Sequence, residues 1–155
     1  MDRTEFTARV QALTDRLYRI SYGQLPEEQD RRDAVQEAIF KAWVNLPRLR
    51  RAEYFETWLV RILLNECHDL QRRRDRDAPL EAAPEPTVSG FDGDAALRDA
   101  VRALPEKLRT AVILYYIEGY STPEIACILR VPRETVKSRL RRARAALKRS
   151  LDEPL

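Results

Sequence analysis

The chain has 155 residues, 34% of them charged and 44% hydrophobic, and its formal net charge is +3. This length allows one domain or two small ones, and the hydrophobic content is enough to bury a core. The longest apolar run, residues 111–117, is far shorter than the roughly 20 residues that cross a bilayer. The residues after Met1 lack the apolar core of a signal peptide, and two distant cysteines indicate no disulfide framework. We therefore expect a reduced, cytoplasmic protein.

The first 76 residues carry three apolar stripes with helical spacing. Residues 23–30 and 46–54, each holding a proline, separate the stripes. The pattern predicts an all-helical N-terminal domain over residues 1–76. Its three stripes consist of Phe6, Val10, Leu13, Leu17 and Tyr18, then Ala34, Val35, Ala38, Ile39, Ala42 and Trp43, and then Trp58, Leu59, Ile62, Leu63, Cys67 and Leu70.

Residues 77–94 differ sharply from the segments on either side. They contain five acidic residues and no basic residue, together with prolines at 79, 84 and 86 and glycines at 90 and 93. Proline and glycine at this density break helices. We predict an extended acidic linker, flexible enough to join two separate domains.

The pattern of residues 95–155 predicts a second helical domain. A helix around 97–104 comes first, Pro105 restarts the chain into a helix over 108–118, and Gly119 ends that helix at the C′ position. Ser121 and Glu124 then form an S-x-x-E capping box for the next helix. Arg130 follows, at a turn where Gly or Asn would more easily adopt positive φ. About 55 residues is small for a stable domain, so we expect this unit to be marginal by itself.

The final helical pattern is strongly basic on one side. Val136, Leu140 and Ala143 recur at helical spacing, and the basic residues fall on a different face. Between residues 133 and 149, eight basic residues stand against the single acid Glu134. A solvated surface helix is the simplest alternative. The basic residues cluster in a helix that directly follows a capped helix in the sequence. This arrangement favours a helix-turn-helix whose second helix enters the DNA major groove.

The sequence offers little from which to build an active site. His68 is the only histidine, there are four glycines, and neither a Ser/His/Asp set nor a phosphate-binding loop is present. Cys67 and His68 are adjacent but have no further metal ligand nearby. We predict no catalytic residue, no metal, no cofactor and no small-molecule substrate.

Five segments in this order resemble the extracytoplasmic-function (ECF) group of the sigma-70 family, the smallest bacterial sigma factors. Residues 17–20 and 30–43 look like the first part of sigma region 2, residues 55–69 look like its end, and residues 104–106 and 135–144 look like region 4. The corresponding sequences are LYRI, DRRDAVQEAIFKAW, FETWLVRILLNECHD, LPE and TVKSRLRRAR. A helix-turn-helix alone occurs in many regulators, whereas the full order across an acidic linker is specific.

The resemblance implies an all-α protein with region 2 over residues 1–76 and region 4 over residues 95–155. It implies a sigma factor, not an enzyme, that binds core RNA polymerase through the β′ coiled coil and the β flap. It also implies recognition of promoter −10 and −35 elements, and control by an anti-sigma factor. By position, the residues that face the β′ coiled coil would be Asp30, Asp33, Gln36 and Glu37.

The −10 element must be read as separated strands, which requires donors, cations and an aromatic shelf. The candidates are Arg48, Arg50, Arg51, Tyr54, Arg61, Asn65 and Asp69, the last three spaced four apart on one helix face. Phe55 and Trp58 fall on the apolar stripe and are expected in the core. The −35 element would be read as duplex, through base edges or nearby phosphates, by Arg133, Glu134, Thr135, Lys137, Ser138, Arg141 and Arg142.

Two other kinds of protein remain as alternatives. A helix-turn-helix repressor or activator would bind a palindrome as a homodimer, and stoichiometry on DNA would distinguish it. A pure interaction protein, such as an anti-sigma factor, would have no reason for so basic a recognition helix, and the His-x-x-x-Cys-x-x-Cys zinc motif of many anti-sigma factors is absent from the sequence.

Overall fold

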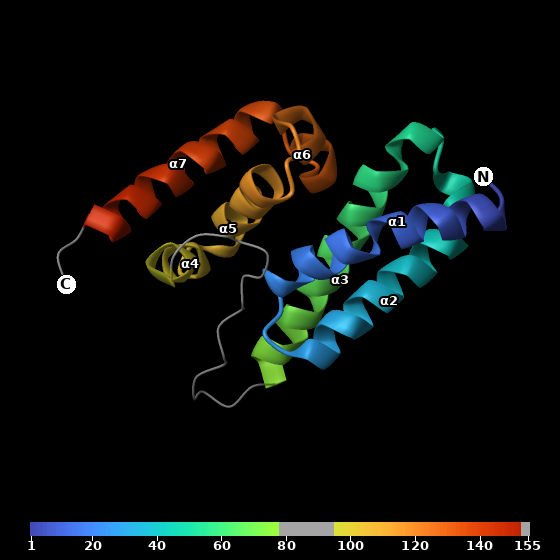
Figure 1. The fold of residues 1–155 in the computed structure, drawn as a ribbon, viewed down its shortest axis with the longest axis horizontal. Helices are drawn as coiled ribbons and strands as arrows, with labels where there is room; N and C mark the ends of the chain where they lie inside the picture. The colour runs from blue at the N-terminus through green and yellow to red at the C-terminus, as the bar shows by residue number, and fades with distance from the viewer. Residues whose placement is uncertain (78–94, 153–155) are drawn as a thin grey trace.

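The computed structural model describes residues 1–77 and 95–152, and every regular element within them is helical. The predicted all-α class is confirmed (Figure 1). The predicted linker lies outside the described residues, apart from Asp77, which is the last residue of α3. No described helix is both long enough and apolar enough to cross a membrane. The elements, in chain order, are α1 (Arg3–Tyr22), α2 (Glu28–Val44), the 3-10 turns η1 (Leu46–Arg48) and η2 (Ala52–Tyr54), α3 (Phe55–Asp77), α4 (Ala95–Arg102), α5 (Glu106–Val112), the π-helical segment η3 (Ile113–Ile117), α6 (Thr122–Leu129) and α7 (Arg133–Asp152).

Helices α1, α2 and α3 form the N-terminal domain by packing their apolar stripes together. Leu17, Leu59 and Leu63 are fully buried between them. Trp43 differs from its predicted place in the core, because it lies in the last turn of α2 and its side chain is 44% exposed. Its ring still packs on that of Phe6, with 5.0 Å between the centroids.

Helices α4 to α7 form the C-terminal domain, and its local signals match the sequence. Gly119 has φ of 79°, and both hydrogen bonds of the capping box between Ser121 and Glu124 are present. Arg130 adopts the left-handed conformation with φ of 55°. The predicted helix over 108–118 differs in kind: α5 gives way to a π-helical segment, in which the Glu118 amide donates to the Ile113 carbonyl five residues back, at 2.9 Å.

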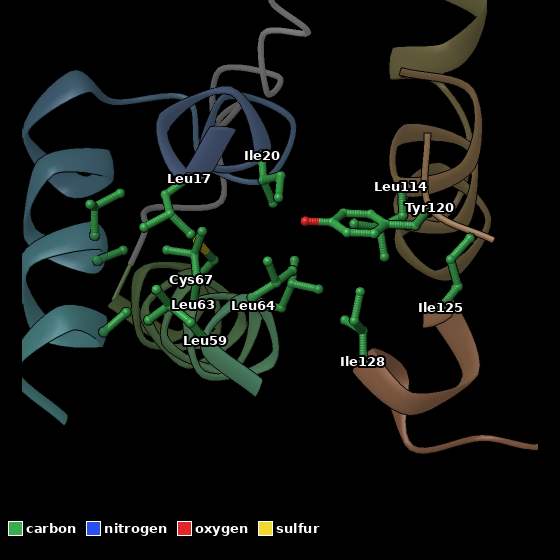
Figure 2. Packing of buried hydrophobic residues seen from close by; sticks show 14 of the residues in the cluster. Leu17, Ile20, Leu59, Leu63, Leu64, Cys67, Leu114, Tyr120, Ile125 and Ile128 are labelled. Carbon is green, nitrogen blue, oxygen red and sulfur yellow. The ribbon is translucent and has the colours of Figure 1, made fainter. Parts of the chain in front are cut away.

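The two domains pack against each other through apolar side chains (Figures 1 and 2). Tyr120 and Ile128 of the C-terminal domain face Ile20 of α1 and Leu64 of α3, and all four are buried. One apolar cluster therefore runs through both domains. The small C-terminal domain gains in this way a core larger than its own residues provide.

Candidate nucleic-acid interface

The outer face of α3 opens onto a hollow of about 840 Å³. The end of α2, the 3-10 turns and the end of α6 complete its walls. We call this the interdomain hollow because Cys127 and Arg130 reach it from the C-terminal domain, whereas its other lining residues belong to the N-terminal domain. Six of the predicted −10 residues line it, namely Arg48, Arg50, Tyr54, Arg61, Asn65 and Asp69.

The three predicted residues of α3 share one face, as the spacing indicated. Arg61, Asn65 and Asp69 are one turn apart and all line the interdomain hollow, while Leu59 and Leu63 on the opposite face are fully buried. Arg51, the remaining −10 candidate, does not line the hollow; its guanidinium lies 3.3 Å from Glu53 and is exposed.

Arg61 has an unusual environment for a cation. Its Nε is buried and has no hydrogen-bond partner among the described residues. Burial, and secondarily the charge of Arg130, lower the pKa of its guanidinium. Two arginines from different domains, Arg61 and Arg130, thus line one hollow. An anionic group placed here would relieve that repulsion.

Several residues of the hollow were not predicted from the sequence. Lys41 of α2 pairs with Glu66 of α3, and this hydrogen bond raises the pKa of the Lys41 ammonium. Trp58 packs against the core as expected and also lines the hollow, and Phe55 is buried as expected. No local pattern identifies Lys41 or Arg130, since each reaches the hollow only through packing between helices.

The second basic surface is the exposed face of α7. Arg133, Lys137 and Arg141 are exposed along it, while Val136 and Leu140 are buried on the other side. The predicted separation of the basic face from the apolar face is confirmed. Of the remaining −35 candidates, Glu134 and Arg142 are exposed, and Thr135 and Ser138 are half-buried.

The predicted polymerase-facing residues fall into two groups. Asp33, Gln36 and Glu37 are exposed on α2. Asp30 is buried, and its carboxylate accepts two hydrogen bonds from Arg74 at the end of α3, at 3.0 and 2.6 Å. This corrects the placement of Asp30 on the exposed face: it joins α2 to α3, because a buried carboxylate requires a charged partner.

The thiol and imidazole in the middle of α3 are structural in character. Burial raises the pKa of Cys67 to about 12, so this thiol stays protonated. His68 Nε2 lies 3.1 Å from Gln24 Oε1 and 3.2 Å from Glu106 Oε1. Within residues 1–77 and 95–152, no group of three His, Cys, Asp or Glu side chains is placed to hold a metal ion.

The two parts of the chain match two different family models. The model of Sigma-70 region 2 matches residues 9–77, and that of Sigma-70, region 4 matches residues 94–147. The ECF RNA polymerase sigma factor SigW of Bacillus subtilis (strain 168) is 31% identical over 97% of this chain and 90% of its own length. The chain belongs to the ECF group of the sigma-70 family. It is a sigma factor that directs transcription initiation, not an enzyme.

Other relatives of this sigma factor cover similar extents. The RNA polymerase sigma-H factor of Pseudomonas aeruginosa is 34% identical over 83% of the chain and 76% of that protein. The sigma factor RpoE of Bartonella quintana, solved in complex with the anti-sigma factor NepR, superposes with a TM-score of 0.78 at 25% identity, over 96% of this chain and 99% of that one. CnrH, solved in complex with the cytosolic domain of CnrY, gives a TM-score of 0.72 at 25% identity, over 97% and 90%.

Proposed function

We propose that this sigma factor reads the −10 element with the interdomain-hollow residues of region 2 and the −35 element with the exposed face of α7. The observation that supports this most directly is the presence of two basic surfaces, one at the interdomain hollow and one on the exposed face of α7. We further propose that the chain acts in the cytoplasm, on core RNA polymerase.

The region 2 surface suits separated strands. Arg48, Arg50 and Arg61 supply cations for the phosphate backbone, and Tyr54 supplies an exposed ring on which a base can stack. The Asn65 amide both donates and accepts hydrogen bonds, so it suits the Watson–Crick edge of an unpaired base. A hollow of about 840 Å³ is large enough to admit a nucleotide.

The region 4 surface suits duplex DNA. Helix α7 has 20 residues, a length of about 30 Å, and its first turns carry Arg133, Lys137 and Arg141 on the exposed side. Arg grips the guanine edge with two hydrogen bonds in the major groove, and Glu134 is placed to accept from cytosine N4. Arg142 and Lys148 add attraction that does not depend on sequence.

The exposed side of α2 is the proposed polymerase surface. Helix α2 exposes Asp33, Gln36 and Glu37, and one turn beyond Gln36 it exposes Phe40, whose side chain is 61% exposed. Acidic groups beside an exposed aromatic ring suit a basic, amphipathic helical partner, which is the β′ coiled coil that the family resemblance names. Asp30 is not included in this surface because it is buried against Arg74.

An anti-sigma factor is the proposed inhibitory partner. The sigma factor RpoE of Bartonella quintana, which superposes on this chain, was solved with the anti-sigma factor NepR, and CnrH was solved with the cytosolic domain of CnrY.

Run-off transcription with core RNA polymerase on genomic fragments tests the proposed function. We expect discrete new transcripts only when the chain is added. The same fragments locate the two promoter elements. If the transcripts do not change and the chain instead binds core-free palindromic DNA tightly as a dimer, the repressor alternative replaces the proposed one.

A further inference from the structure

The segment between α2 and α3 carries much of the proposed −10 surface. We call residues 45–54 the connecting segment, and its Arg48, Arg50 and Tyr54 line the interdomain hollow. Its two 3-10 turns are closed by hydrogen bonds between near neighbours, such as that from the Tyr54 amide to the Arg51 carbonyl at 3.1 Å. Such bonds fix the shape of each turn, but they do not fix where the turn lies relative to the helices.

The two turns of the connecting segment are attached to the domain in different ways. In η1, Leu46 packs against the apolar core, and so does Leu49 directly after it. In η2, all three side chains are exposed, so no buried apolar group within the turn anchors it. The buried side chain of Phe55 fixes the start of α3, after the turn. The turn itself is held by a polar contact.

Arg9 of α1 supplies that contact. Its Nη1 donates to the Ala52 carbonyl at 2.6 Å, across 43 positions of the sequence. The other hydrogen bonds of η2 within the described residues join it to close neighbours in the chain. Figure 1 shows the start of α1 beside the connection between α2 and α3. A guanidinium bonded to a carbonyl makes a charge-assisted hydrogen bond, which is stronger than a neutral one.

The Arg9 side chain is itself held in place. Its Nη2 donates to the carboxylate of Glu5, one turn earlier in α1, at 2.9 Å. Its guanidinium carbon lies 5.9 Å from the centre of the Phe55 ring, within reach of a cation–π contact. The donors of a guanidinium form a rigid fork, so the bond to Glu5 orients the bond to Ala52.

Aromatic side chains tie α1 to the same place from behind. Phe6, one turn before Arg9, packs on Phe55 with 5.7 Å between the ring centroids, and Phe55 packs on Trp58 at 6.1 Å. Trp58 lines the interdomain hollow, whereas no residue of α1 does so. Helix α1 thus supports the wall of the hollow without being part of its surface.

A connecting segment that is fixed before DNA binds favours selective recognition. A loop that becomes ordered on binding loses conformational entropy, and a loop already held in place loses less. Selectivity also requires that hydrogen-bond donors and stacking rings keep their places to within a fraction of an ångström. Arg50 and Tyr54 each lie two residues from Ala52, so a tether at the Ala52 carbonyl restricts both.

We infer that Arg9 is a positioning residue for −10 recognition, which holds η2 against α1 and thereby places Arg50 and Tyr54 at the rim of the interdomain hollow. It acts through the Ala52 carbonyl and does not itself contact DNA. The inference rests on the proposed function of the hollow. It adds a determinant of selectivity on α1, a helix in which no residue is proposed to bind DNA or polymerase.

Holoenzyme assembled from core RNA polymerase and the full chain tests this inference. The probes are a single-stranded oligonucleotide with the −10 element that run-off transcription locates, and a second one with a single base of that element substituted. We call the ratio of the two affinities the selectivity. Arg9→Met removes the donor but keeps an unbranched side chain that suits a helix. We expect its selectivity to fall about tenfold, the size of one charge-assisted hydrogen bond.

Further measurements separate positioning from a general structural role. Affinity for −35 duplex and for core polymerase should not change in Arg9→Met. Arg9→Lys keeps a cationic donor and should recover much of the selectivity. Arg3→Met removes the same charge from an exposed position of α1 and should behave as wild type. Amide hydrogen exchange at residues 54 and 55, whose N–H groups close η2, should quicken in Arg9→Met but not in Arg3→Met.

The outcomes distinguish the role of Arg9 from the proposed function. If wild-type holoenzyme binds both oligonucleotides equally, the proposed reading of the −10 element fails. If wild type is selective and a folded Arg9→Met protein keeps its selectivity, or exchanges the two amides as slowly as wild type, Arg9 is not a positioning residue. An Arg9→Met protein that is unfolded by circular dichroism, or that loses −10, −35 and core binding equally, would also overturn the inference, because Arg9 would then support the whole domain.

Discussion

Arg141 illustrates how one exposed side chain distinguishes base reading from phosphate contact. It lies two turns beyond Arg133 and one beyond Lys137, on the face of α7 opposite the buried Leu140. If it grips a base edge, Arg141→Ala should weaken −35 binding by about 1–3 kcal/mol and relax the preference at one base pair. Lys148→Ala, farther along α7, should weaken binding equally for all sequences and make the salt dependence shallower.

Binding to a −35 library at two salt concentrations measures both effects. Neither change disturbs the buried face of α7, so both proteins should remain folded. Wild-type affinity and preference for Arg141→Ala at both salt concentrations would exclude this residue from the DNA interface.

Asp33 and Glu37 are also residues whose exposure makes a clean test possible. They lie one turn apart on the outer side of α2, and neither is buried. Reversal of both to Lys should abolish co-elution with core polymerase, because two repulsive contacts replace two attractive ones. The matched control, Glu5→Lys with Asp15→Lys, makes the same charge change at exposed positions of α1. Equal loss of core binding in both double variants would point to net charge instead of a docking surface.

At the scale of the element, the turn between α6 and α7 carries a measurable cost. Arg130 ends α6 in the left-handed conformation, which is unfavourable by about 1 kcal/mol for a residue with a Cβ. Arg130→Gly and Arg130→Ala both remove the charge, but only glycine adopts the left-handed conformation without backbone strain. We therefore expect the free energy of unfolding of the glycine variant to exceed that of the alanine variant by about 1 kcal/mol. Denaturant unfolding of the two proteins measures this difference. Equal free energies of unfolding would show that the left-handed conformation at residue 130 carries no measurable strain.

Some features of the helices follow from the local sequence, and others depend on tertiary packing. The capping box of α6, the stop at Gly119 and the strained Arg130 were all predictable, because each depends on residues within one turn of the chain. The π-helical segment Ile113–Ile117 was not predictable. The π-helical segment has more residues per turn than an α-helix, and it lies where Ile113 packs against Gly23 of region 2. We attribute the segment to this packing between the regions and not to helix propensity.

At the scale of the whole molecule, His68 lies where α3 meets the C-terminal domain, with Nε2 3.2 Å from Glu106 Oε1. It is the only histidine in the chain, so its resonance in an NMR titration is unambiguous. Burial lowers the pKa of its imidazole, and nearby charges modify that effect, with Glu106 and Asp69 raising the pKa and Arg72 and Arg109 lowering it. Because the folded chain favours neutral His68, the stability that this group contributes should be fully present above the ordinary histidine pKa of about 6.5 and should be lost as the pH falls below it.

The sequence by itself determined the helices, the order of the two domains, the family and most of the candidate residues, because apolar spacing, caps and charge clustering are properties of adjacent turns. Tertiary structure decided which of those residues meet. Asp30 pairs with Arg74, which is 44 positions away in the sequence, and Glu118 accepts a hydrogen bond from Arg19, which is 99 positions away. Such pairs depend on how separate helices cross, and no periodicity within one helix encodes a neighbour on another. For the same reason the packing of region 4 against region 2 follows only from the tertiary structure.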